Sequence, residues 1–156
     1  MGAGKIFCII GGIITLLGTF LFSLAGAAPF YLSYLGFLEN LATWFSSGDV
    51  LIIIMTVLFL IFMISGVFIL IGLKVRALAI IGGIFGIIVG IYFLLSLYGV
   101  LPFEASQFIL LFFNDALVPG IIPLDVPLGD ASLGTYFMLG GGVLGLIGGI
   151  MGTEDF

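Results

Sequence analysis

The sequence offers few side chains that could carry out a reaction. Its 156 residues include one Cys, no His, eight acidic residues and three basic residues. Without His, neither a Ser-His-Asp triad nor a Cys/His metal cluster can form. Glu104 and Asp115 could act as paired carboxylates, although solvation or helix capping explains both more simply. We therefore expect a protein that is not an enzyme and that has no metal or cofactor.

The charged residues also avoid the middle of every long apolar stretch. Ionisable side chains within a membrane usually mark ion coupling or a proton relay, so the sequence indicates no such pathway. Cys8 lies in an apolar turn and is most simply a core or lipid-facing residue. Three basic residues also give no electrostatic basis for binding nucleic acid.

The composition is typical of a membrane protein. Hydrophobic residues make up 63% of the chain and charged residues 7%, whereas about a quarter of the residues of a soluble domain are charged. Four apolar stretches are long enough to cross a bilayer as helices, at about residues 6–27, 50–73, 77–98 and 131–152. The predicted fold is an all-α integral membrane protein, one four-helix domain over residues 1–156 with two outward segments that contain amphipathic, interfacial helices.

The first apolar stretch also fits a signal peptide, because Ala25-Gly26-Ala27 resembles a cleavage site. Its apolar run is longer than the ~7–15 residues of a signal core, so we expect a retained span. Small residues recur along it at every fourth position. They are Gly11, Thr15, Thr19, Ser23 and Ala27. Such a stripe predicts close helix packing, and its hydroxyl-bearing members are the candidate lining of a pore.

Lys74-Val75-Arg76 separates two apolar stretches and predicts the turn of a tight helical hairpin. This turn and Lys5 hold all the basic residues of the chain, and in a four-span protein they lie on the same side. The positive-inside rule makes that side cytoplasmic. Lys5, Lys74 and Arg76 are thus the predicted topology determinants of a multi-pass plasma-membrane protein with both termini in the cytoplasm. Residues 28–48 and 99–131 then face outward.

The first outward segment has helical periodicity over residues 30–45. Its less apolar positions follow one another at spacings of three and four. They are Ser33, Gly36, Asn40, Thr43 and Ser47. This pattern predicts a short amphipathic helix near the membrane surface, with Tyr31, Tyr34 and Trp44 as interfacial anchors at the headgroup level. The alternative interpretation is a surface that binds a partner.

The second outward segment combines an apolar patch, Phe108 to Phe113, with Pro119, Pro123 and Pro127. The patch is too short to cross a bilayer, and predicts a helix on the interface or against the bundle. The prolines favour extended chain. Before the second span, Asp49 is predicted to cap the helix N-terminus.

Glycines form two doubled G-x-x-x-G patterns, one in the third predicted span and one in the fourth. They are Gly82, Gly86 and Gly90, and Gly141, Gly145 and Gly149. A doubled pattern, or glycine zipper, indicates close contact between helices. We expect both zippers to be helix-packing faces. Because four spans have a limited interior, we expect at least one of them to form the interface of a homo-oligomer.

Matching stretches in the two halves of the chain indicate a parallel internal repeat of residues 1–73 and 74–156. Ile9-Ile10-Gly11-Gly12-Ile13 matches Ile80-Ile81-Gly82-Gly83-Ile84, and Lys5 matches Arg76 at the same offset. Chance matching between two apolar sequences is the alternative.

The apolar opening from Gly4 to Phe20, with Gly11-Gly12 at its middle, and the four-span plan resemble uncharacterised small four-span membrane proteins of archaea. In plan alone, the chain is similar to claudin-like, tetraspanin-like and connexin-like proteins, which also have inward termini and two outward segments. Those families use disulfides in their outward segments, and a chain with one Cys forms none. The resemblance therefore implies a layout and assigns no site residue.

Three functions remain in play. The first is a non-enzymatic structural or scaffold protein that self-associates through its glycine-rich helix faces, with the lipid bilayer, itself and other membrane proteins as partners. The second is an oligomeric pore or channel. The third is an accessory subunit of a larger membrane complex. The particle size in mild detergent would discriminate them, since a ring favours a pore or scaffold and a foreign partner favours the accessory subunit.

Overall fold

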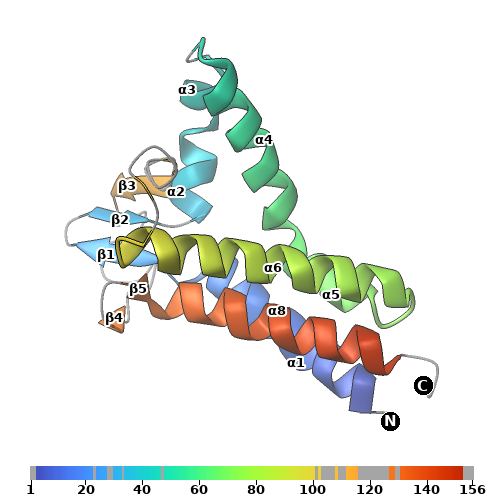
Figure 1. Cartoon of the computed structure of the whole chain (residues 1–156). Helices are drawn as coiled ribbons and strands as arrows, with labels where there is room; N and C mark the ends of the chain where they lie inside the picture. The colour runs from blue at the N-terminus through green and yellow to red at the C-terminus, as the bar shows by residue number, and fades with distance from the viewer. Residues whose placement is uncertain are drawn as a thin grey trace.

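The computed structural model describes residues 3–22, 24–27, 30–32, 34–46, 48–100, 102, 108, 112–115, 127–128 and 131–152. Within these ranges, four helical stretches are long and apolar enough to cross a membrane (Figure 1). They are α1 (Ala3–Phe20), α4 with α5 (Val50–Met63 and Ser65–Ile71), α6 (Arg76–Leu97) and α8 (Leu133–Met151). The prediction of a four-span, multi-pass membrane protein is confirmed at this level.

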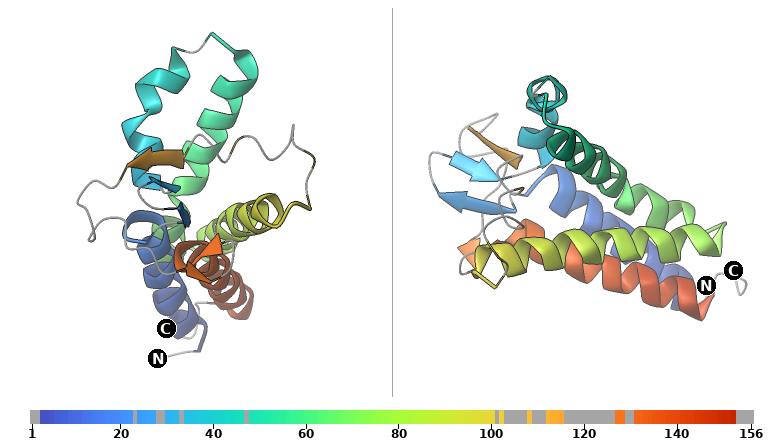
Figure 2. Two further views of the ribbon diagram at one scale, coloured as in Figure 1. Left: turned by 90° about the vertical axis from the view of Figure 1, so that its left-hand side faces the viewer. Right: turned by 45° about the horizontal axis from the view of Figure 1, so that its top comes forward.

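The helices α1, α5, α6 and α8 lie side by side and form the bundle (Figures 1 and 2). α1 packs against α5 and α8, and α6 packs against the same two helices. The start of α1 and the end of α8 meet at one end of the bundle, where Gly4 lies against Gly152. The start of α6 lies there too, because Arg76 bonds to the end of α8. The three predicted topology determinants are therefore at the same end.

The second span is not the single helix predicted over residues 50–73. α4 ends at Met63 and α5 begins at Ser65, with Ile64 between them in a turn at φ −86° and ψ 10°. α5 stays in the bundle, whereas α4 swings out from it (Figures 1 and 2). Ser-Gly pairs are frequent sites of helix bending, and Ser65-Gly66 follows the turn directly.

The first span ends earlier than predicted. α1 stops at Phe20, and Ala25–Ala27 forms strand β1. β1 pairs antiparallel with β2 (Phe30–Leu32), and β2 pairs antiparallel with β3 (Phe113–Asp115) of the other outward segment. This sheet gives hydrogen-bond partners to backbone groups that no helix satisfies, and it joins the two outward segments.

The fourth span also begins beside a short ladder. β4 (Pro127–Leu128) pairs antiparallel with β5 (Ala131–Ser132), so α8 begins at Leu133 and not at the predicted residue 131. The Leu24 carbonyl accepts a hydrogen bond from the Ser132 amide at 3.0 Å and another from the Thr135 hydroxyl at 2.6 Å. The start of α8 is thus tied to the chain that follows α1.

The first outward segment is only partly the helix predicted over residues 30–45. Its first three residues form β2, because they pair with strands on both sides. The rest forms two short helices, α2 (Tyr34–Glu39) and α3 (Leu41–Phe45). The helical periodicity is correct for this part, and it misses a strand too short to carry a pattern of its own. Ser33 and Ser47, at the ends of the predicted polar stripe, lie outside the described residues.

An aromatic cluster fills the space where α2, α4 and α6 meet. Its buried members come from both outward segments and from three spans. They are Leu24, Tyr34, Phe37, Phe59, Val89, Phe93, Phe108, Phe112 and Met138. Four aromatic rings lie 4.8–4.9 Å from the ring of Phe112, a separation at which edge-on and stacked contacts are favourable. Phe108 and Phe112 of the second outward patch therefore pack against the bundle, whereas residues 109–111, and with them the predicted helix, lie outside the described residues.

Tyr34 lies inside the aromatic cluster and not at the headgroup level predicted for it. Its side chain is fully buried, and its hydroxyl donates a hydrogen bond to the Phe59 carbonyl at 3.2 Å. Burial raises the pKa of Tyr34 well above its ordinary value, so the hydroxyl stays protonated and donates. Trp44 is half-buried, and the Tyr31 side chain lies outside the described residues.

A finer prediction about the second span is confirmed. The Asp49 side chain caps α4 by accepting a hydrogen bond from the Leu51 amide at 2.9 Å. The span is also the least buried of the four, in keeping with a bulky, β-branched helix that faces lipid over much of its surface.

Candidate functional sites

The six zipper glycines all lie against other helices of the same chain. Those of α6 face α5 (Gly82) or α8 (Gly86 and Gly90), and those of α8 face α1 (Gly141), α5 (Gly145) or α6 (Gly149). A methyl group added at any of them would come within 3.0 Å of a neighbouring helix. These positions are therefore filled from within the chain, and none of the six is open to a second copy as predicted for at least one zipper.

The glycine contacts of α1 recur in α6. A methyl group on Gly11 would lie 2.7 Å from the Gly141 carbonyl oxygen in α8. A methyl group on Gly82 would lie 2.6 Å from the Ser65 carbonyl oxygen in α5. Gly11 and Gly82 occupy the same place in the two matching stretches, so α1 meets α8 as α6 meets α5.

The glycines of α5 and α8 also make matching contacts, with α6 and α1 respectively. Gly72, at the end of α5, lies against Ala79 of α6. Gly148, near the end of α8, lies against Cys8 of α1. Cys8 and Ala79 are themselves counterparts in the matching stretches. Cys8 is therefore a buried helix-packing residue, which is one of the two predicted roles.

Residues 65–74 thus correspond to residues 141–150, a match that the reading of the sequence missed. They read Ser-Gly-Val-Phe-Ile-Leu-Ile-Gly-Leu-Lys and Gly-Gly-Val-Leu-Gly-Leu-Ile-Gly-Gly-Ile. The likeness needs a different offset from that of the α1 and α6 stretches, since the outward segments differ in length. A comparison that allowed this shift would have found it. The duplication itself stays a prediction, whereas the shared contacts are a property of the fold.

The basic residues at the end of the bundle differ in what they bind. Arg76 donates hydrogen bonds from Nε to the Gly149 carbonyl at 2.6 Å and from a terminal guanidinium nitrogen to the Ile150 carbonyl at 2.8 Å. It therefore caps the C-terminal end of α8, where carbonyls lack partners within the helix. Lys5 also takes part in an interaction within the chain. Lys74 is exposed, and its ammonium group makes no hydrogen bond or ion pair with the described residues.

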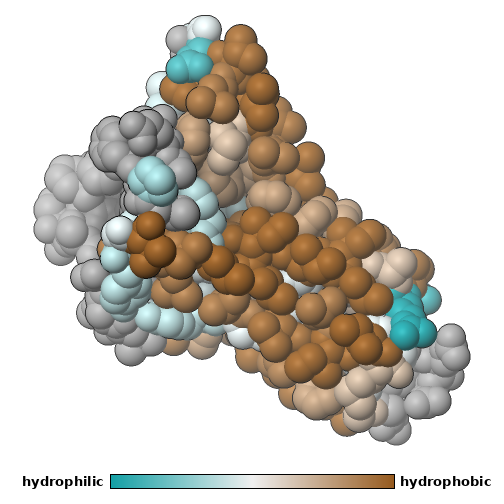
Figure 3. Space-filling view, in the orientation of Figure 1, coloured by the Kyte–Doolittle hydropathy of each residue, from teal (hydrophilic) through white to brown (hydrophobic). Residues whose placement is uncertain are grey.

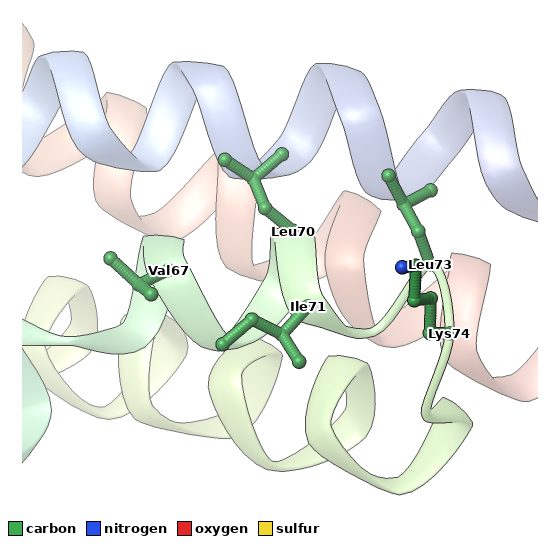
Figure 4. Close-up of a pocket in the computed structure, with 5 residues that line it drawn as sticks. All are labelled: Val67, Leu70, Ile71, Leu73 and Lys74. Carbon is green, nitrogen blue, oxygen red and sulfur yellow. The ribbon is translucent and has the colours of Figure 1, made fainter.

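A groove runs along the outer face of α5 and ends at Lys74 (Figure 4). It encloses about 380 Å³ and is lined by Val67, Leu70, Ile71, Leu73 and Lys74. Leu70 and Leu73 point toward α1, whereas Val67 and Ile71 lie on the side of α6. The lining is apolar except for the single ammonium group at its end.

The helices α2, α3 and α4 form an outer arm that stands away from the bundle (Figures 1 and 2). Large apolar side chains are exposed along α4. They are Val50, Leu51, Ile54, Val57, Leu58 and Ile61. Val57, Leu58 and Ile61 lie three, four and seven residues after Ile54, so the four form one stripe on the helix. Figure 3 shows apolar residues covering α4 and continuing onto α6, with polar residues gathered toward the ends.

The predicted pore lining does not face an open path in the described residues. Thr15 and Thr19 are fully buried. The Thr15 hydroxyl donates to the Gly11 carbonyl at 2.7 Å, and the Thr19 hydroxyl donates to the Thr15 carbonyl at 2.7 Å. Both groups are therefore satisfied by their own helix. Ser23, the third member of the stripe, lies outside the described residues.

Comparisons with known proteins do not identify a family or a function for the chain. No protein-family description, no curated protein and no solved structure matches the chain. The resemblance of its opening and layout to small four-span membrane proteins accordingly stays a prediction.

Proposed function

We propose that this protein is a non-enzymatic, multi-pass plasma-membrane protein with a structural role in membrane assembly, and that its outer arm binds a second copy of the same chain. One observation carries the proposal. The second span leaves the bundle at Ile64 and exposes an apolar stripe on α4, whereas the matching part of α8 stays packed between α1 and α6.

The fold itself argues for a second copy as the occupant. Between helices in lipid, association depends on close packing, because lipid tails are as apolar as the side chains. The zipper glycines are already filled within the chain, and the exposed apolar face of α4 stands away from the bundle, where a second copy can reach it (Figure 1). A twofold pair of arms would present the Ile54-to-Ile61 stripe to itself, which is the self-complementary arrangement of most dimers.

The same proposal includes the orientation. Lys5, Lys74 and Arg76 lie at one end of the bundle, and the sheet and outer arm lie toward the other. By the positive-inside rule the first end is cytoplasmic, which puts both termini in the cytoplasm and the outer arm on the outer side. In this orientation the arm meets its partner in the outer half of the membrane.

Cysteine cross-linking in membranes tests the proposal. Cys8→Ala removes the only native thiol, and Ala79 shows that alanine suits the matching position. In this background, Val57→Cys should cross-link into a dimer, because Val57 lies on the exposed face of α4. The matched control is Val143→Cys on α8, which is 40% exposed, as Val57 is 42% exposed, and which lies on a helix packed against α1, α5 and α6.

The outcomes separate the proposed function from its rivals. A Val57 dimer with no Val143 dimer supports the arm-to-arm interface. A Val57 adduct to a different protein would overturn self-association and support an accessory subunit. Cross-links at both positions, in a ring-sized particle, would support an oligomeric pore. If neither cysteine cross-links and the extracted protein is a monomer, the assembly role is wrong.

A further inference from the structure

We propose that the groove on α5 binds one anionic phospholipid. The lipid phosphate would pair with the Lys74 ammonium, and an acyl chain would lie along Val67, Leu70 and Ile71 (Figure 4). This inference concerns a different face of the molecule from the outer arm and stands independently of self-association.

Of the three basic residues, Lys74 is the one that we assign to the lipid phosphate. Arg76 of the same turn is committed to two carbonyls of α8, and Lys5 is engaged within the chain. The Lys74 side chain is exposed and, in the described part of the chain, its ammonium group makes no hydrogen bond or ion pair. A basic side chain at the membrane surface attracts anionic headgroups, and no described residue neutralises this one.

The shape argument concerns the walls of the groove. Val67, Leu70 and Ile71 are three or four residues apart, so they share one face of α5, and Lys74 lies in the turn that follows the helix. Leu73 adds a wall on the side of α1. Four apolar side chains leading to one ammonium group match a molecule with an acyl chain and a phosphate. A free phosphate ion would find one exposed cation and no further donor in the lining.

The second half of the chain supplies an internal comparison. Val143, Leu146 and Ile147 of α8 correspond to Val67, Leu70 and Ile71. At the two remaining places, Gly149 stands where α5 has Leu73, and Ile150 stands where it has Lys74. The face on α8 therefore lacks both the wall and the charge. The lipid site should accordingly exist once per chain, on α5.

Native mass spectrometry of the full chain in mild detergent tests this site, with dioleoylphosphatidylglycerol as the anionic probe and dioleoylphosphatidylcholine as the zwitterionic one. The wild type should retain one phosphatidylglycerol per chain in preference to phosphatidylcholine. Lys74→Ala should weaken this retention roughly fivefold, since one basic residue near the surface contributes about 1 kcal/mol. Lys74→Arg should keep it. Unchanged elution and melting of Lys74→Ala show that the variant folds.

A second pair of variants tests the walls. Ile71→Trp should fill the groove and lower phosphatidylglycerol retention, whereas Ile147→Trp, at the matching place on α8, should not. Their wild-type side chains are 44% and 40% exposed, which makes them a fair pair. Equal effects of the two would overturn the groove. Equal retention of both lipids, unchanged retention in Lys74→Ala, or displacement of the lipid by millimolar inorganic phosphate would overturn the proposed ligand.

Discussion

The inner halves of the second and fourth spans make matching contacts in the bundle, whereas their outer halves differ. α5 and the end of α8 make matching contacts, through Gly72 with Ala79 and through Gly148 with Cys8. Beyond them α8 continues straight, whereas the second span bends at Ile64 and α4 leaves the bundle (Figure 1). Two spans with the same inner half thus have different outer halves.

The difference follows from which residues face each other in the outer half. In the second half of the fold, α8 approaches α1 so closely that a methyl group on Gly18 would lie 2.7 Å from the Gly134 carbonyl oxygen. In the first half, the corresponding residues are Val89 of α6 and Leu58 of α4. Two large side chains cannot permit the separation that two glycines allow. The aromatic cluster, with Val89 in it, occupies the space that α4 leaves.

The largest expected effect concerns the glycine contacts that both halves need. In Gly83→Leu, the added side chain would start 2.6 Å from the Gly142 carbonyl oxygen. Neither backbone can give way, so we expect a loss of ~3 kcal/mol or more, or no folded protein. The matched control is Gly140→Leu, because nothing lies within 4 Å of the added group there, and it should change stability by less than ~0.5 kcal/mol. Unfolding in detergent measures both, and equal effects would contradict the packing described.

The next effect tests why the two outer halves differ. Gly18→Val gives α1 the side chain that α6 has at Val89, so it should push the outer half of α8 away as α4 is pushed away. We expect a loss of about 1–3 kcal/mol, typical of overpacking, and faster thiol labelling of a cysteine placed at buried Thr135. Leu17→Val, at a neighbouring exposed position, is the control. Unchanged labelling of Thr135→Cys in Gly18→Val would show that bulk at this position does not direct the helix.

A smaller effect concerns the hydrogen bond that links the aromatic cluster to α4. Tyr34→Phe removes one hydrogen bond to the Phe59 carbonyl and should cost about 1 kcal/mol. The pKa of Tyr34 is raised by burial, so the folded state favours the neutral hydroxyl. The stability that this provides is complete below the unfolded pKa of about 10 and is lost above it. Melting curves from pH 8 to 11 should therefore fall more steeply for the wild type than for Tyr34→Phe, and parallel curves would contradict this role.

The smallest effect separates the two basic residues of the inner turn. Arg76→Ala removes the cap on α8 and should destabilise the protein by about 0.5–1 kcal/mol, with Arg76→Lys keeping part of it. Lys74→Ala should leave stability unchanged, because the Lys74 side chain has no hydrogen-bond or ion-pair partner among the described residues. Thermal melting of the three variants decides the comparison. A loss in Lys74→Ala equal to that in Arg76→Ala would mean that both residues support the fold.

The span count was predictable because ~20 apolar residues have one stable form in a bilayer. Asp49 as a cap was predictable because its effect is local. The bend at Ile64 was not, since we explain it by comparing Val89 and Leu58, on spans distant in the sequence, with the two glycines at the corresponding places. Tyr34 was placed at the headgroup level because its chemistry suits that level, whereas Phe112 and Phe59 provide a buried place for it.

The glycine zippers show where the sequence stops being informative. Their spacing predicts close contact of helices, but spacing is the same for a partner in the same chain and for one in another. In the structure, Gly86 lies against the Met138 carbonyl and Gly145 lies against the Ile69 side chain, both in the same chain. The groove that ends at Lys74 also had no sequence signal, because its walls form only when α5 packs against its neighbours. The sequence likewise does not tell Lys74 from Arg76, and the structure shows that Arg76 is bound to α8.

Two distances within one chain test the bent second span most directly. Spin labels at Val67 and Ile84 report the separation of α5 and α6, and labels at Ile53 and Tyr98, two heptads further out on the same faces, report that of α4 and α6. Dilution with unlabelled protein removes distances between chains. The bend predicts that the outer distance is clearly longer than the inner one, because α4 leaves the bundle at Ile64. Equal distances would mean a straight, packed span and would contradict the outer arm.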